Sequence, residues 1–337
     1  MIISGCLLPL MQLAKTWSIC QNYITTNMAF AESDTLESIG RVLQDKSKPL
    51  KDRFRALFTL KNLGGKDAID SIAACFDDES ALLKHELAYC LGQMQDTYAL
   101  PTLTGVLQDT RQEAMVRHEA GEALGAIGCS ECIEVLQQYA KDPVIEVAET
   151  CQLALERLEW LNSERSKTEK LSTNPYSSVD PAPPSVSEDV NSLRDALLDE
   201  SLSLFKRYRA MFSLRNNGSD EAVIALAEGL KCKSALFRHE IAYVLGQMQN
   251  KVCVKQLSEN LKDKGESSMV RHECAEALGS IATEDCTQIL AEYLKDSERV
   301  VKESCIVALD MSEYENSGQF QYADSLVKAQ SVGTEVN

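Results

Sequence analysis

The chain has 337 residues, a net charge of −17 at pH 7, 44% apolar residues and 25% charged residues. This length accommodates two domains that each bury a core, and the apolar content is ordinary for a globular protein. The acidic balance argues against general nucleic-acid binding, which needs a basic surface, and favours a cationic substrate or a basic partner unless it serves only solubility.

We expect residues 1–35 to form a disordered leader. The apolar run from Cys6 to Met11 has no basic residue before it, so it lacks the pattern of a secretory signal peptide. No stretch approaches the roughly 20 consecutive apolar residues that cross a bilayer. The 12 cysteines stand mostly singly, which is typical of reduced thiols. These features predict a cytoplasmic protein without membrane contact.

An internal duplication organises the rest of the chain. Three segments of the first half recur in the second half at one offset and without a gap, which is strong evidence of duplication. The matching segments are residues 52–62 with 206–216, 85–95 with 239–249, and 115–125 with 269–279, each 154 residues apart.

A shorter period lies inside each half. Leucine and alanine recur every three or four residues, as on one face of a helix, and short breaks rich in Asp, Gly and Ser follow about every thirty residues. Strand signals are nearly absent. The pattern predicts an all-α fold, an α-solenoid of helical hairpins in which each repeat buries the apolar face of its neighbour. We expect two pseudo-symmetric halves of about four repeats each, residues 36–160 and 191–314.

Residues 161–190 separate the two halves and are rich in serine, proline and acidic side chains. Four of the chain's eight prolines fall between Pro175 and Pro184. Such a composition buries little apolar surface, so it predicts a flexible linker that lets the halves move. Residues 315–337 are expected to form a tail.

Every histidine in the chain is followed by a glutamate. The two pairs within each half lie 33 residues apart, whereas Val147-Ala148 occupies the same place in the fourth repeat, so repetition alone does not require the pairs. The simplest structural alternative is that each pair is exposed to solvent at the start of a helix, where the helix dipole favours glutamate. The four pairs are His85-Glu86, His118-Glu119, His239-Glu240 and His272-Glu273.

The array has the composition of a metal centre. Helices in adjacent repeats pack about 8–10 Å apart, so two inward-facing imidazoles can reach one ion with bonds of about 2.1 Å. Each half then supplies two histidines and at least one carboxylate, a ligand set typical of non-haem iron. Eight candidate ligands are too many for one ion and suit two. We therefore predict a two-metal centre between facing halves.

The segments around the four pairs resemble the HEAT-like repeats of deoxyhypusine hydroxylases. The resembling segments read LKHELAYCLGQM and VRHEAGEALG in the first half, and FRHEIAYVLGQM and VRHECAEALG in the second. The resemblance covers residues from about 36 to 313 with all four motifs intact. The Met1–Asn27 extension is the notable departure and does not touch the motifs.

The resemblance implies a non-haem di-iron monooxygenase, an oxidoreductase of hypusine biosynthesis. Such an enzyme uses O2 to hydroxylate the deoxyhypusine side chain of eukaryotic translation initiation factor 5A, a post-translational modification. The implied cofactors are two Fe ions per chain, cycling between Fe2+ and Fe3+, with O2 as co-substrate and an external reductant. We expect a monomer with no nucleic-acid or membrane partner.

The resemblance also assigns roles to the array. All four histidines would bind iron, and Glu119 and Glu273 are the carboxylates placed most firmly on metal. Glu86 and Glu240 match ligand positions too, but as catalytic groups they can instead hold bridging water or the substrate's amines. The implied metal ligands are His85, Glu86, His118, Glu119, His239, Glu240, His272 and Glu273.

Three alternatives remain open from the sequence. A non-catalytic scaffold of helical repeats would bind a protein partner on its concave face and hold no metal. A repeat enzyme similar to bilin lyases would have no reason to keep four His-Glu pairs. A zinc or manganese hydrolase also stays open, because ligand type alone does not fix the metal.

Overall fold

The computed structural model describes residues 33–319 and 321–325. Within these ranges the chain forms helices and turns and contains no strand, which confirms the all-α prediction. No helix in this part is both long and apolar enough to cross a bilayer. The expected leader lies almost entirely outside the described residues, since the first helix begins at Ser33.

Each half consists of four helical pairs. In the first half the pairs are α2 (Ser33–Gln44) with α3 (Leu50–Leu63), α4 (Lys66–Ala73) with α5 (Ala81–Met94), α6 (Leu100–Gln108) with α7 (Ala114–Ile127), and α8 (Ile133–Tyr139) with α9 (Ile145–Leu161). In the second half they are α11 (Val190–Leu198) with α12 (Leu204–Asn217), α13 (Asp220–Glu228) with α14 (Ala235–Met248), α15 (Val254–Lys262) with α16 (Ser268–Ile281), and α17 (Glu284–Glu292) with α18 (Arg299–Glu315). This arrangement confirms the predicted solenoid of helical hairpins.

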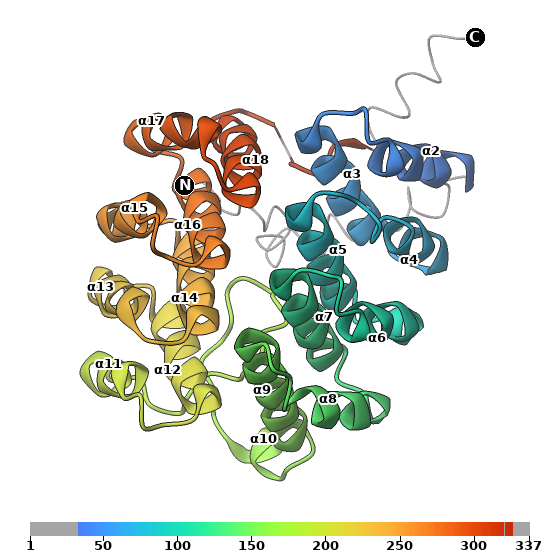
Figure 1. Cartoon of the computed structure of the whole chain (residues 1–337). Helices are drawn as coiled ribbons and strands as arrows, with labels where there is room; N and C mark the ends of the chain where they lie inside the picture. The colour runs from blue at the N-terminus through green and yellow to red at the C-terminus, as the bar shows by residue number, and fades with distance from the viewer. Residues whose placement is uncertain (1–32, 320, 326–337) are drawn as a thin grey trace.

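The second helix of every pair lies on the inside of a closed ring (Figure 1). Within each half these inner helices pack in series, α5 on α7 and α7 on α9, then α14 on α16 and α16 on α18. The halves meet twice: α9 contacts α12 and α14, and α18 contacts α3 and α5. The inner helices of the two halves therefore face each other across the middle of the molecule.

The two junctions between the halves are related by the duplication. The Ser80 hydroxyl donates a 2.6 Å hydrogen bond to Glu303, and the Ser234 hydroxyl donates a 2.7 Å bond to Glu149. Ser234 is the counterpart of Ser80 in the second half, and Glu303 is the counterpart of Glu149. The halves thus pack around a pseudo-twofold axis.

Small residues let the inner helices approach closely. A Cβ added to Gly92 on α5 would lie 2.7 Å from the Cα of Ala123 on α7, and one on Gly246 of α14 would lie 3.1 Å from the Cα of Ala277 on α16. Contacts this short leave no space for a larger side chain. The close approach fixes the spacing between neighbouring helices that each carry a His-Glu pair.

A recurring buried arginine ties three of the repeats to the repeat that follows in the chain. In each case Nε donates to the carbonyl of a leucine that precedes the arginine, at the end of the outer helix of the same repeat. A guanidinium nitrogen donates to an aspartate that follows in the chain, at the same spacing each time. Since two of these arginines directly precede His118 and His272, the contacts hold the start of those helices in place. The three arginine–aspartate pairs are Arg53–Asp78 (2.7 Å), Arg117–Asp142 (2.6 Å) and Arg271–Asp296 (2.6 Å).

Replacing Asp296 by asparagine is expected to lower the free energy of unfolding by about 3 kcal/mol, because Arg271 would stay buried without its counter-charge. Burial alone would raise the pKa of Asp296, but hydrogen bonds from Arg271 and the Glu298 amide bring it below its ordinary 3.8. The carboxylate therefore stabilises the fold above that value, and its contribution is lost as pH falls through the lower pKa of the folded state. Chemical denaturation at pH 7 and at pH 3 measures both effects.

The exposed Asp285 provides the control for this substitution, since Asp285→Asn removes the same charge without burying an unpaired arginine. Equal stability of the Asp296→Asn variant and the wild type at pH 7 would contradict the role given to the pair.

Residues 161–190 join the halves and pack against both of them. Apart from the short α10 (Arg165–Thr168) the segment has no helix, but Asp180 accepts hydrogen bonds of 2.8 and 2.6 Å from Arg215, and its carbonyl accepts one of 2.9 Å from Arg157. The composition predicted a flexible linker between the halves. The contacts that the segment makes in the structure are polar, and a count of apolar residues does not register such contacts.

Candidate metal centre

The four histidines occupy equivalent positions in four inner helices. Each is the fifth residue of its helix, on α5, α7, α14 and α16. Their side chains are buried, with exposed fractions of 3% for His85, 0% for His118, 4% for His239 and 0% for His272. The helical repeat therefore directs all four imidazoles to the inside of the ring.

The imidazoles from the two halves meet. Ring centroids lie 5.5 Å apart for His85 and His118 in the first half, and 5.2 Å apart for His239 and His272 in the second. Across the halves the distances are 5.6 Å for His85 and His239, 5.2 Å for His85 and His272, and 5.3 Å for His118 and His239. The structure thus brings together the four residues that the sequence singled out.

In each half, a histidine of one repeat faces a glutamate of the next. The Nε2 atom of His85 lies 3.2 Å from Oε2 of Glu119, and Nε2 of His239 lies 3.3 Å from Oε2 of Glu273. Adjacent ligands of one octahedral ion with bonds of about 2.1 Å are about 3 Å apart, so both distances suit a shared metal ion. The two contacts are equivalent under the duplication.

Most of the imidazole nitrogens have no hydrogen-bond partner among the described residues. Both ring nitrogens of His118, His239 and His272 are buried and lack a hydrogen-bond partner, and the same is true of Nε2 of His85. Buried polar atoms are normally satisfied, and a group of orphaned nitrogens beside carboxylates is the donor set of a metal. The residues present therefore fit bound metal ions.

Ligand atoms converge in three overlapping groups, each within 4.8 Å. One group is His85, His118 and Glu119, the trio expected for the first half. In the second half, His272 and Glu273 form a group with Glu276 and not with His239. His239 belongs to a separate group with His85 and His272. These groups of buried residues are His85–His118–Glu119, His272–Glu273–Glu276 and His85–His239–His272.

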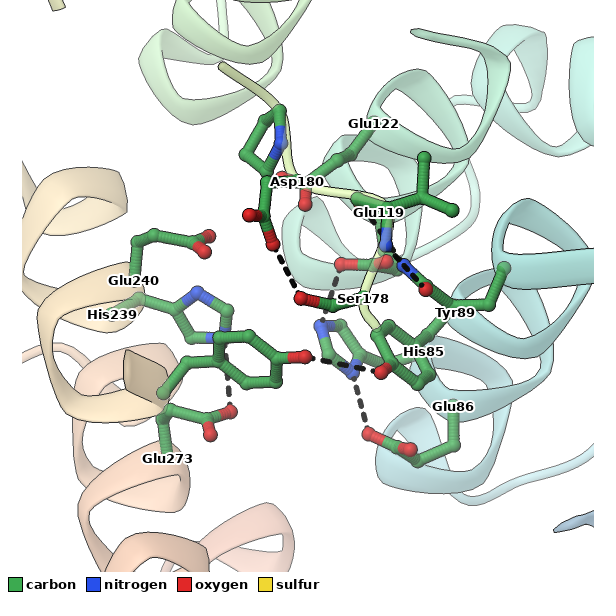
Figure 2. Close-up of a pocket in the computed structure, with 14 residues that line it drawn as sticks. His85, Glu86, Tyr89, Glu119, Glu122, Ser178, Asp180, His239, Glu240 and Glu273 are labelled. Carbon is green, nitrogen blue, oxygen red and sulfur yellow. Dashed lines mark hydrogen bonds and ion pairs between the residues drawn. The ribbon is translucent and has the colours of Figure 1, made fainter. Parts of the chain in front are cut away.

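A narrow pocket opens onto this cluster (Figure 2). Tyr89 and Tyr243, four residues after His85 and His239, face each other across it with their hydroxyls 3.1 Å apart. No lysine or arginine is among the described residues that line the pocket. Its carboxylates are Glu86, Glu119, Glu122, Asp180, Glu240 and Glu273.

Burial and crowding shift the ionisation of the groups in the site. Burial raises the pKa of Glu86, and raises that of Glu240 well above its ordinary value with a further contribution from Glu122. Burial and the neighbouring His239 and His85 lower the pKa of His118 well below 6.5. A bound divalent cation would offset the burial of these carboxylates, and the unprotonated form of His118 is the form that binds a metal.

Comparison with known proteins decides the family. Models of HEAT repeats match residues 223–310, and the PBS lyase HEAT-like repeat matches residues 116–142 and 206–232. The deoxyhypusine hydroxylase of Danio rerio is 63% identical over 302 residues, which cover 89% of this chain and 99% of that protein. The Homo sapiens protein is 62% identical over 291 residues, covering 86% and 95%. The chain belongs to the deoxyhypusine hydroxylase family.

A solved structure supports the same assignment. Human deoxyhypusine hydroxylase in complex with glycerol matches with a TM-score of 0.80 at 63% identity, covering 83% of this chain and 96% of that one. Membership of a hydroxylase family makes the chain an enzyme, and the resemblance inferred from the His-Glu segments is confirmed.

The sequence patterns did not point to several residues of the cluster and the pocket in this deoxyhypusine hydroxylase relative. Glu122 and Glu276 follow His118 and His272 by four residues, so each lies one helical turn further along the same face. That spacing is a signal the sequence carried. Asp180 and its neighbours, in contrast, reach the pocket from the segment between the halves. Nothing in the sequence pattern indicated their position.

Proposed function

We propose that this chain hydroxylates the deoxyhypusine side chain of eukaryotic translation initiation factor 5A, forming hypusine, with two iron ions held between its halves. The observation that carries the proposal is the buried cluster of four imidazoles and facing carboxylates, in which most ring nitrogens lack a hydrogen-bond partner among the described residues, in a chain that is about 62–63% identical to deoxyhypusine hydroxylases. A scaffold that only binds a partner gives no reason to bury such a cluster, because unsatisfied polar atoms cost stability.

The residues suggest a division of the ligands between two ions. His85, His118 and Glu119 would hold one ion, and His239, His272 and Glu273 would hold the other. Bound iron would supply the activation of O2, with electrons from an external reductant. One oxygen atom enters a C–H bond of the substrate, and the other leaves as water with two electrons and two protons.

The remaining pocket residues act on the substrate. Deoxyhypusine is a lysine side chain extended by an aminobutyl group, so it presents two ammonium groups on a long apolar chain. Glu86 and Glu240 line the pocket as carboxylates that can bind such ammonium groups, while the Tyr89 and Tyr243 rings flank its apolar part. Burial of the cluster keeps bulk water from the reacting atoms.

Other features of the chain suit a cytoplasmic enzyme. The cysteines of the described residues are all free, as expected in a reducing compartment. The acidic charge suits a substrate that carries a cationic side chain. We propose a cytoplasmic monomer that binds the protein substrate directly and uses neither nucleic acid nor membrane.

Hydroxylation by the purified chain tests the proposed function. After loading with Fe(II), the chain is incubated with O2, a chemical reductant and initiation factor 5A that carries deoxyhypusine. We expect mass spectrometry to show the gain of one oxygen atom on that side chain. Metal-free chain and reactions without O2 serve as controls and should give no product. An iron-loaded, folded chain that yields no hydroxylated product would contradict the proposal.

A further inference from the structure

Two cysteines outside the metal centre lie in contact with each other. Cys129 and Cys132 are the ends of the sequence CSEC, where the chain passes from α7 to α8. Their sulfur atoms are 3.2 Å apart. Among the described residues no other two cysteines are hydrogen-bonded to each other, and Cys129 is the one cysteine that is not buried. The pair has no part in the proposed hydroxylation.

Cys129 occupies a position that caps a helix in other repeats. It directly follows a residue that ends an inner helix in the left-handed backbone conformation. At four equivalent positions the side chain accepts a hydrogen bond from a backbone amide of the helix that follows, but the Cys129 side chain makes no such bond. A capping role therefore does not account for this thiol. The four capping residues are Asp96, Ser219, Asn250 and Thr283.

The second half contains the same turn with one thiol replaced by a hydroxyl. Thr283 and Cys286 are the counterparts of Cys129 and Cys132 at the offset of the duplication. The Thr283 hydroxyl accepts a 3.3 Å hydrogen bond from the Cys286 amide and donates one of 3.0 Å to the Cys286 sulfur. The fold thus brings the first and fourth side chains of this turn together in both halves, and the first half has sulfur at both positions.

The geometry of the first-half turn suits a disulfide. The Cys132 amide donates a 3.3 Å hydrogen bond to the Cys129 carbonyl, which closes the turn. The first and fourth Cα atoms of a turn lie within about 7 Å of each other, a separation that a disulfide spans. The two sulfur atoms need to approach by only about 1 Å to reach bonding distance. Bond formation therefore requires a small local adjustment and no rearrangement of the repeats.

The two thiols differ in exposure, and this difference assigns their roles. Cys132 is 2% exposed, and burial together with the contact with Cys129 raises its pKa to about 12. At neutral pH it stays protonated and is shielded from reagents in solution. Cys129 is partly exposed, and its neighbours Ser130 and Glu131 are exposed. A small oxidant in solution therefore reaches the Cys129 sulfur first.

We propose that Cys129 and Cys132 form a redox-active dithiol that hydrogen peroxide oxidises to a disulfide and that thiol reductants restore. The Cys129 sulfur attacks one peroxide oxygen, the O–O bond breaks, and a sulfenic acid and one water molecule form. The Cys132 sulfur then attacks the sulfenic sulfur, the S–O bond breaks, and a second water molecule leaves with the Cys132 proton. The two thiols lose two electrons and two protons in all, and both peroxide oxygens end as water. Disulfides in reducing compartments are typically of this transient kind.

Peroxide titration of the full-length chain tests the proposal. The reduced chain is treated with hydrogen peroxide and unfolded, its remaining thiols are alkylated, and the tryptic peptide 118–141 is analysed by mass spectrometry. We expect this peptide to lose two hydrogen atoms and both alkylation sites. The loss should occur at lower peroxide than any oxidation of the other described cysteines, which are all buried, and dithiothreitol should reverse it.

Cys129→Thr is the matched control, since it gives the first half the arrangement that the second half already has. In this variant Cys132 should stay reduced and accept the alkylating reagent after peroxide treatment. Cys132→Ser should form no disulfide and stop at a sulfenic acid on Cys129, which dimedone traps. The proposal is wrong if the wild-type peptide keeps both alkylation sites at peroxide concentrations that oxidise the buried cysteines, or if Cys132 is oxidised equally in Cys129→Thr. None of these measurements depends on iron or on hydroxylation, so their outcome is independent of the proposed function.

Discussion

Replacing His118 by asparagine is expected to reduce bound iron from about two ions per chain to one or fewer and to abolish hydroxylation. His118 is fully buried, and neither of its ring nitrogens has a hydrogen-bond partner among the described residues, so no other structural role accounts for its place. The loss of activity should exceed about 100-fold, which is the cost of removing a group that only supports a ligand. Iron analysis and the hydroxylation assay measure the two effects.

The duplication provides a second variant for the same prediction. His272→Asn removes the equivalent residue of the other half and should cause the same loss, because both halves contribute to one centre. Glu221→Gln changes an exposed residue of α13 and is the control for effects of substitution and purification that do not involve the metal centre. A folded His118→Asn variant that keeps two irons and wild-type activity would rule out His118 as a ligand.

The sequence was sufficient to locate the imidazoles. The helical period and the duplication at a single offset place His85, His118, His239 and His272 at one position of equivalent helices. Both signals are local, since each depends only on spacing along the chain. The prediction that all four gather between facing halves follows from them, and the ring distances agree with it.

The positions of the remaining residues of the cluster and the pocket depend on long-range contacts. A glutamate four residues after a histidine, such as Glu122 or Glu276, has the same pattern as a solvated acid on a helix surface. Only packing decides that Glu276 meets Ser304 while Glu122 faces the pocket. Residues 178–181 illustrate the same limit, because their position depends on side chains that are distant in sequence, such as Gln93 and Arg215. The amino-acid composition of a segment indicates how much apolar surface it can bury, but it does not predict polar contacts of this kind.

The closure of the ring also depends on such a contact, made by Arg55 on α3. Its guanidinium donates 2.9 Å to Asp310 on α18 and 3.2 Å to Asp324, and it lies 4.4 Å from the centre of the Tyr322 ring. The side chains of Arg55 and Asp310 are 8% and 5% exposed. One buried cation thus ties the first half to the last helix and to the segment after it.

Replacing Arg55 by methionine is expected to lower the free energy of unfolding by about 3–5 kcal/mol, because Asp310 would stay buried without this partner. The effect should extend to the metal centre. Non-covalent contacts hold the junction of α3 and α18, including those of the segment after α18, whereas residues 161–190 also join the halves covalently at the other junction. Weakening of this contact should therefore let the halves separate and lower the affinity for iron. Chemical denaturation and iron titration measure the two effects.

Arg209, the counterpart of Arg55 in the second half, is the matched control. It donates 2.6 Å to Glu169 and 2.9 Å to the Pro184 carbonyl, both within the segment that joins the halves. Arg209→Met should cost stability but retain more iron than Arg55→Met, because the chain still holds that junction together. Iron that binds only the closed ring stabilises it by mass action, so excess Fe(II) should restore part of the stability lost in Arg55→Met. Equal iron affinity in Arg55→Met and the wild type would mean that the centre does not depend on this closure.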